Sequence, residues 1–184
     1  MAFLTRSVPL LAAIVLMAAP GDAGGQPLTA GEDEVKAAFV YRFGSFVEWP
    51  PAAFPDDASP FEIAIAGSDE VAAHLKTLTE ARTMNGRAVV VRRVERVEDV
   101  GRPHVLFVGR AARRAFASLV GSVAGSPVLV ITEIENGVAQ GSMIDLVVDA
   151  ERVRFDVAPD AAAAQELKIS SRVLAIARRV SKDG

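Results

Sequence analysis

Hydrophobic and polar positions follow a helical period in the stretch from Glu32 to Trp49. The apolar residues recur three or four positions apart, as on one face of an amphipathic helix. They are Val35, Phe39, Phe43 and Phe46, with Ala38 and Val47 widening the stripe. Pro50 and Pro51 follow directly, and a residue before proline is pushed out of the helical region. The pattern therefore predicts a helix that rests one face on a core and stops at the prolines.

Apolar runs without this period come next, and their valine and isoleucine content predicts strands. These runs are residues 61–66, 88–94, 104–109 and 128–133. Helices are expected between them, from Ser68 or Asp69 to about Ala81 and from Arg110 to about Val120. Strands that alternate with helices favour parallel pairing, with helices on the faces of the sheet.

The pattern changes after Asn136-Gly137. Residues 143–148 and 152–157 predict an antiparallel hairpin that closes one edge of the sheet. Asp160 is the expected cap of a long final helix that reaches about Val180. Apolar residues surround most of that helix, so it would lie within the core or be covered by a partner. The predicted fold is a single three-layer α/β domain: a mostly parallel sheet flanked by helices, with an antiparallel C-terminal hairpin and a long C-terminal helix.

The first residues have the order of a secretory signal, in which a charged start precedes an apolar run and small residues. Arg6 is followed by the twelve apolar or small residues of 8–19, fewer than the roughly 20 that cross a bilayer as a helix. We predict a signal peptide over residues 1–23, a flexible segment over 24–31 and one α/β domain over 32–182. The mature protein is expected to be exported without inserting into a membrane.

Composition narrows the function classes. The formal net charge is −3 and stays there when residues 1–23 are removed, because that segment holds one Arg and one Asp. A mildly acidic domain has no long-range attraction for nucleic acid or an anionic membrane. The chain has no cysteine, which excludes disulfides and thiol chemistry.

Residues with catalytic or metal-binding chemistry are present but not arranged for it. They are His74, His104, Ser170-Ser171, Asp145, Asp149 and Asp156. The histidines lack metal-ligand spacing, the serines lack a nucleophile elbow, and the aspartates alternate with apolar residues as on a half-exposed hairpin. We therefore predict no catalytic residue, no metal and no cofactor.

A weak ligand crevice is the next candidate. Gly67 and Ser68 follow one predicted strand, and Gly109 and Arg110 follow another, so backbone amides at both strand ends could face a shared ligand. The alternative is that both glycines simply make turns.

Residues 41–50 form the most unusual stretch, because they hold the only Trp and the only Tyr of the chain together with two phenylalanines. One interpretation is that the helix docks on the sheet and Trp49 plugs its end. The other is a contact surface for a protein partner, since Trp and Tyr carry much of the binding energy at interfaces.

Taken in order, several short motifs resemble the YfiR-like periplasmic proteins, which include the HmsC-type members. The resemblance runs from about Val35 to Val180. Its markers are residues 35–41, 46–50 (FVEWP), 85–87 (NGR), 104–108 (HVLFV), 141–144 (GSMI), 154–157 (RFDV) and 167–171 (LKISS).

The resemblance implies a non-enzymatic periplasmic regulator. Members bind the periplasmic domain of an inner-membrane diguanylate cyclase of the YfiN type and hold it inactive, which lowers cyclic di-GMP and biofilm formation. Redox-responsive members carry cysteines where this chain has Ala64 and Pro103. The resemblance therefore implies repression by binding. The cysteines through which redox-responsive members are controlled are absent from this chain.

Two functional hypotheses remain open. The first is a repressor whose partner surface is built from Phe46, Trp49 and Ile169, with a homodimer as a further possibility. The second is a small-ligand-binding or transport-accessory module that uses the strand-end crevice. Neither needs nucleic acid or direct insertion into a membrane.

Overall fold

The structure is a computed structural model that describes residues 31–181. The predicted signal peptide and most of the predicted flexible segment lie outside the described residues. The helices are α1 (Glu32–Phe46), α2 (Asp69–Thr79), α3 (Phe116–Ser122), α4 (Pro159–Ala163) and α5 (Ser171–Ile176). The strands are β1 (Val47–Glu48), β2 (Phe61–Ala66), β3 (Thr83–Met84), β4 (Arg87–Val94), β5 (Val105–Val108), β6 (Leu129–Thr132), β7 (Ile144–Asp149), β8 (Arg152–Val157), β9 (Lys168–Ile169) and β10 (Arg179–Val180).

Within residues 31–181 the main sheet has eight strands, in the order β10-β8-β7-β6-β5-β2-β4-β3. Pairing is parallel from β4 through β2, β5 and β6 to β7, and again between β8 and β10. The β7–β8 and β3–β4 pairs are antiparallel. The mostly parallel sheet and the C-terminal hairpin are thus confirmed. The hairpin does not close the edge, because β10 pairs with β8 outside it.

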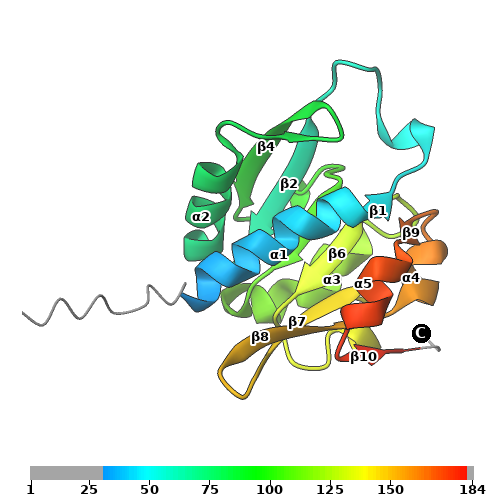
Figure 1. The fold of residues 1–184 in the computed structure, drawn as a ribbon. Helices are drawn as coiled ribbons and strands as arrows, with labels where there is room; N and C mark the ends of the chain where they lie inside the picture. Colours follow the sequence, from blue (N-terminus) through cyan, green and yellow to red (C-terminus); the bar gives the residue numbers. More distant parts are fainter. Residues whose placement is uncertain (1–30, 182–184) are drawn as a thin grey trace, which may run out of the picture.

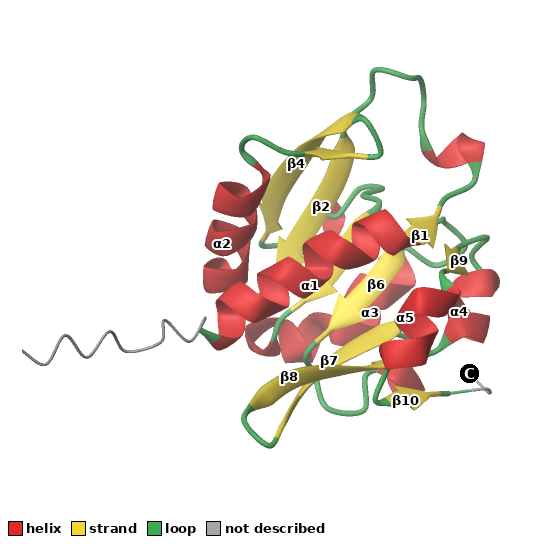
Figure 2. Ribbon diagram, viewed as in Figure 1, coloured by secondary structure: helices red, strands yellow, loops and turns green. Residues whose placement is uncertain are grey.

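Helices cover both faces of this sheet, which confirms the three-layer arrangement (Figures 1 and 2). Alternate residues of a strand point to opposite faces. Phe107 of β5 therefore joins a core with α1, α2 and α5, whereas its neighbour Leu106 joins a second core with Phe116 and Leu119 on the side of α3.

Helix α1 crosses the first face from the carboxyl ends of the parallel strands to their amino ends (Figure 1). Three acidic residues, Glu32, Asp33 and Glu34, occupy its first turn, where they complement the helix dipole. The helix ends at Phe46 because the next two residues pair with β9. The helix therefore begins beside the carboxyl ends of the parallel strands and ends beside their amino ends.

The prediction of one long C-terminal helix is wrong. The segment contains α4, β9, α5 and β10 in succession. Glu166 takes a positive φ of 59°, which ends the first helical segment, and the backbone of β9 pairs with β1. Leu167, Ile169 and Val173 are nevertheless buried, so these apolar residues reach the core from a loop, from β9 and from α5, and not from one helix.

Smaller corrections concern the other helices. The chain from Arg110 to Ala115 is a 3-10 helix, and α3 begins only at Phe116. Helix α2 ends at Thr79 and α1 ends at Phe46, both earlier than expected. No helix in the described part of the chain is long and apolar enough to cross a membrane.

Candidate functional site

The predicted partner residues Phe46, Trp49 and Ile169 come together where α1 meets the short β1–β9 ladder. Val47 pairs with Ile169 in this ladder, and the amide of Ser170 donates to the carbonyl of Phe46 at 2.9 Å. Ile169 is buried, with 8% of its surface exposed, whereas Phe46 and Trp49 are partly exposed and pack on the core. The exposed surface at this place is therefore contributed by Phe46 and Trp49, and little of it by Ile169.

Trp49 takes part in the core as well as in the surface. Its ring stands at 90° to the ring of Phe61 with centroids 5.1 Å apart, and it lies 6.3 Å from the ring of His104. The indole Nε1 is buried and has no hydrogen-bond partner among the described residues. The indole thus closes the end of α1 by edge-to-face packing and not through a hydrogen bond.

Next to Trp49, planar side chains from distant segments form a stack over the start of β2. The ring of His104 is stacked between Phe54, at 4.3 Å, and Phe61, at 4.7 Å. The guanidinium of Arg87 covers Phe54 at 4.1 Å. We call Arg87, Phe54, His104 and Phe61 the aromatic stack.

The aromatic stack holds down the segment of residues 50–60, which we call the strap. His104 is 5% exposed, and its Nδ1 accepts from the amide of Glu62 at 3.0 Å. The other ring nitrogen, Nε2, lies 3.2 Å from the carbonyl of Ala53 in the strap and must donate to it. Both bonds require the neutral ring with its proton on Nε2. Burial lowers the pKa of His104, although the bond to Ala53 and the charge of Glu62 oppose the shift.

The outer turn of the strap is tied to the sheet by Arg87, which donates to the carbonyls of Asp56 at 2.8 Å and Ser59 at 2.9 Å. Asp56 folds the turn on itself, since its Oδ1 accepts from the amides of Ala58 and Ser59. The hydroxyl of Ser59 also donates to Oδ1, at 2.9 Å, and this bond, followed by those from the two amides, lowers the pKa of Asp56. The strap therefore has two attachments to the sheet, through His104 and through Arg87.

Sequence reasoning placed His104 and Arg87 among the motifs of the resemblance but did not bring them together with Trp49. Phe54 and Phe61 received no functional role. The stack joins residues 54, 61, 87 and 104 from four separate segments, and no local pattern reports such contacts. The NGR and HVLFV motifs were the available signal.

The predicted ligand crevice lies at the carboxyl ends of β2 and β5, where the backbones of Gly67 and Gly109 are in close contact. A side chain at Gly109 would begin 2.3 Å from the carbonyl oxygen of Gly67. The amide of Gly109 donates to Ala66 at 2.7 Å, and the hydroxyl of Ser68 accepts from Val71 at 3.3 Å. An open hollow of about 540 Å³, lined in part by Gly67 and Ala112, lies beside this contact.

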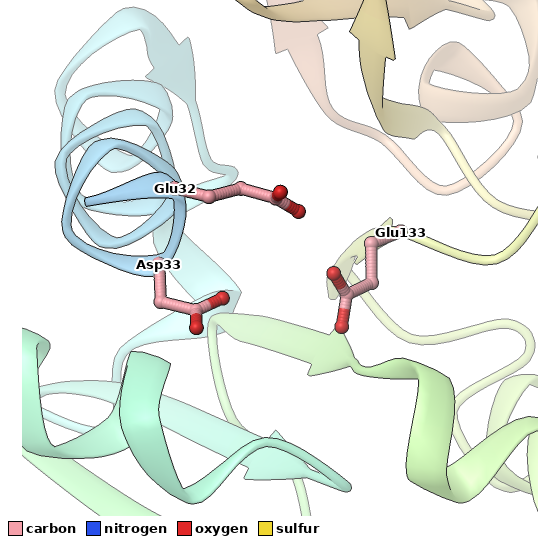
Figure 3. Close-up of side chains that lie close together, drawn as sticks. All are labelled: Glu32, Asp33 and Glu133. Carbon is pink, nitrogen blue, oxygen red and sulfur yellow. The ribbon is translucent and has the colours of Figure 1, made fainter. Parts of the chain in front are cut away.

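Three carboxylates meet near these strand ends: Glu32 and Asp33 come from the first turn of α1, and Glu133 follows β6 (Figure 3). The ammonium of Lys36 lies among them, 2.5 Å from Glu32, 3.5 Å from Asp33 and in contact with Glu133. Arg110 adds a backbone bond of 3.0 Å to Glu133. The position a cation would take is thus filled by Lys36, and we call these five residues the ion-pair network.

The electrostatics of the network favours the charged forms of Lys36 and Glu32. Burial by itself would lower the pKa of Lys36, but its bonds to Glu133 and Glu32 outweigh burial, and the pKa lies above the ordinary value. The bond from Lys36 lowers the pKa of Glu32. The network ties the start of α1 to the end of β6 across 97 residues of sequence.

The remaining sequence candidates are engaged in the fold. Asp145 is 3% exposed and accepts from the hydroxyl of Ser142 and, at 2.7 Å, from the amide of Val138; its burial raises its pKa. Asp156 forms a two-bond pair with Arg178 at 2.8 and 2.5 Å. Ser170 caps α5, and His74 is exposed on α2.

Comparison with protein families finds a match to the family described as YfiR/HmsC-like over residues 33–178. Among solved structures, the chain is similar to a conserved domain protein from Vibrio cholerae, with a TM-score of 0.55 and 13% identity over 82% of this chain. It is also similar to the ABC domain in complex with L-Trp from Streptococcus pneumonia, with a TM-score of 0.53 and 13% identity over 79% of this chain. The match spans 60% of the length of each of these two structures, and at this identity it supports the fold alone.

Proposed function

The chain belongs to the YfiR/HmsC-like family, and from that membership we propose that it is a periplasmic protein that binds the periplasmic sensor domain of an inner-membrane diguanylate cyclase and holds the enzyme inactive. Repression would lower cyclic di-GMP and with it biofilm formation. The observation that carries the proposal is the extent of the family match, which takes in the chain from α1 to the end of α5.

The amino-end edge of the sheet supports a contact role. Phe46 and Trp49 are partly exposed there, next to the strap and the guanidinium of Arg87. Aromatic and arginine side chains supply much of the binding energy at protein interfaces. We propose that the partner binds over Phe46 and Trp49, with Ile169 supporting them from below through the β1–β9 ladder.

We propose binding and not catalysis as the mode of action. Both ring nitrogens of His104 are engaged, Ser170 caps a helix, and the carboxylate of Asp145 is held by two donors. Within residues 31–181 these candidates form no nucleophile, base and orienting group in hydrogen-bond reach of one another. Repression would then depend on the affinity and geometry of the contact.

The way in which repression ends cannot involve thiols of this chain, because it has no cysteine. Ala64 lies in β2 and Pro103 directly precedes His104, at the two positions where the resemblance associates cysteines with redox control. A homodimer remains a prediction beside the cyclase contact.

The experiment that tests the proposal combines affinity and signalling. The purified cyclase sensor domain is titrated with wild-type protein and with Phe46→Ala and Trp49→Ala, and cyclic di-GMP is measured in a deletion strain that expresses each form. We expect Trp49→Ala to weaken binding of the folded protein by about 2 kcal/mol, roughly thirtyfold, and to leave cyclic di-GMP high.

Val148→Ala is the matched control. Val148 is an apolar residue with 45% of its surface exposed, and it lies on the hairpin away from the β1–β9 ladder. This variant should bind and repress like the wild type. Urea unfolding of each variant corrects the affinity for the folded fraction. Wild-type affinity in folded Trp49→Ala would remove Trp49 from the contact surface, and unchanged cyclic di-GMP on deletion would remove the repressor role.

A further inference from the structure

His104 attaches the strap to the sheet through its contacts with Ala53 and Phe54. Its ring is stacked on both faces, accepts a bond from Glu62 of β2 and donates one to Ala53 of the strap. The strap in turn leads from Trp49 to β2, so its position decides the surroundings of the proposed partner surface.

We propose that His104 is a pH-sensitive latch for the strap. When the medium turns acidic, Nδ1 takes a proton from solvent, the bond from the Glu62 amide is lost, and the strap with Phe54 leaves its place beside Trp49. The part of this inference that concerns repression rests on the proposed function; the latch itself is a property of the isolated chain.

The hydrogen-bond geometry makes the protonated ring incompatible with its site. An imidazolium donates from both nitrogens and accepts from neither. Its Nδ1–H would face the N–H of Glu62 at a separation of 3.0 Å, so two donors would oppose each other. Both donors would find acceptors only if the ring turned or moved outward, and either movement breaks the stack with Phe54 and Phe61.

Charged groups on several neighbouring elements surround the ring of His104. Arg87 of β4, stacked on the far face of Phe54, disfavours a second positive charge. The carboxylate of Glu62 favours it but is shared with Arg92 at 3.6 Å. Asp56 and Asp57 are exposed at the outer turn of the strap, and Arg102 is exposed two residues before the ring. Burial is the largest influence and lowers the pKa of His104.

The direction of the pH effect follows from this lowered pKa. The attached state holds the neutral ring, so the released state binds a proton more readily, and attachment weakens as the pH falls below about 6.5. Asp145 acts in the opposite sense, because its pKa is raised in the fold and its protonation in acid favours the folded state. A step of the expected sign in this window therefore belongs to a histidine.

The chain allows a direct assignment, since it has two histidines and one tryptophan. Trp49 emission is recorded from pH 7.5 to 4.5 on the mature protein without any partner, in the wild type, in His104→Gln and in the control His74→Gln. Hydrogen exchange of the Glu62 amide and the NMR titration of the His104 ring are followed in the wild type. These two measurements decide the question even if His104→Gln does not fold.

We expect one step with its midpoint below about 6.5, in which the His104 ring titrates, Trp49 emission changes and the Glu62 amide loses its protection. The step should persist in His74→Gln and be absent in His104→Gln. The latch is wrong if the ring titrates while Trp49 and Glu62 do not respond, or if the step survives in His104→Gln.

Binding to the cyclase sensor domain separates the two proposals. Affinity that falls in acid for the wild type and His74→Gln, but not for His104→Gln, supports control of the partner surface by the latch. A pH-independent affinity beside an intact Trp49 step overturns that control. If the domain binds at no pH, the proposed function fails while the emission and exchange results still decide the latch.

Discussion

The carboxyl ends and the amino ends of the strands, which we call the two edges of the sheet, are covered by different kinds of interaction. At the carboxyl ends of the strands, Lys36 and its carboxylates form an ion-pair network, and Gly67 meets Gly109 through backbone atoms. At the amino ends, the aromatic stack and Trp49 cover the sheet with rings, one neutral histidine and an indole N–H that has no partner among residues 31–181. Helix α1 joins the two edges (Figure 1).

In open α/β sheets, ligands usually bind at the carboxyl ends of the strands. At this end the charges of the ion-pair network satisfy one another and the backbones of Gly67 and Gly109 are in close contact. Open hollows remain beside them, one of about 540 Å³ next to Gly67 and one of about 1170 Å³ next to Arg110 and Glu133. The amino ends are covered by aromatic stacking and by hydrogen bonds of His104 and Arg87, and Phe46 and Trp49 are partly exposed there. We therefore expect the carboxyl end to govern stability and the amino end to govern recognition.

The largest effect is expected from Lys36→Met. The side chain of Lys36 is 2% exposed and that of Glu133 is 6% exposed, so the change leaves a buried carboxylate without its ammonium. Removing one partner of a buried pair costs about 3 to 5 kcal/mol, and we expect the lower end because Arg110 still donates to Glu133. Urea unfolding gives the free-energy change, and folded Lys36→Met should bind the partner normally.

Lys168→Met is the control for Lys36→Met. Lys168 is paired with Glu48 at 3.3 Å, but both side chains are more than 70% exposed. An exposed pair of this kind contributes about 0 to 1 kcal/mol. Equal losses of stability in the two variants would contradict the view that the buried network at the carboxyl end is the stronger closure.

An intermediate effect is expected from Gly109→Ala. The added methyl would begin 2.3 Å from the carbonyl oxygen of Gly67 and 2.9 Å from the Cβ of Ser68, so the main chain must move. Overpacking of this kind costs about 1 to 3 kcal/mol. Gly121→Ala is the matched control: nothing lies within 4 Å of its added methyl, and alanine in a helix should raise stability slightly. A neutral Gly109→Ala would mean that the two strand ends can separate, which would favour the ligand-binding alternative.

The sequence predicted those parts of the molecule that depend on local patterns. The run 61–66 is β2 with the same bounds, and 152–157 is β8, because uninterrupted or alternating apolar residues report burial directly. The final segment was misread because Leu167, Ile169 and Val173 imitate a helix that is apolar all around, while β9 is defined by its pairing with β1, 120 residues earlier in the chain.

The candidate site was predicted in part for the same reason. Phe46 and Trp49 were predicted because aromatic residues are concentrated in this stretch. The β1–β9 ladder, in which Val47 pairs with Ile169, brings them close to Ile169. The aromatic stack could not be predicted, since Phe54, Arg87 and His104 meet only after the strap folds back over the sheet. The close contact of Gly67 and Gly109 could not be predicted either, because a strand followed by glycine predicts a turn but not the distance between two turns.

The smallest effect is expected from Trp49→Phe, which separates the packing of Trp49 from its N–H group. Phenylalanine keeps an aromatic ring beside Phe61 but removes part of the buried apolar surface, which costs stability. It also removes a buried donor that has no acceptor in the described part of the chain, and an unsatisfied buried group costs about 1 to 3 kcal/mol. The two contributions have opposite signs, so urea unfolding should give a net change within about 1 kcal/mol of the wild type. A loss of more than about 2 kcal/mol would mean that the N–H bonds an ordered water or another group, since a hydrogen bond would then be lost together with the packing. In that case Trp49 would be held by a polar contact as well as by packing, which would weaken the contrast between the aromatic closure of the amino ends and the ion pairs of the carboxyl ends.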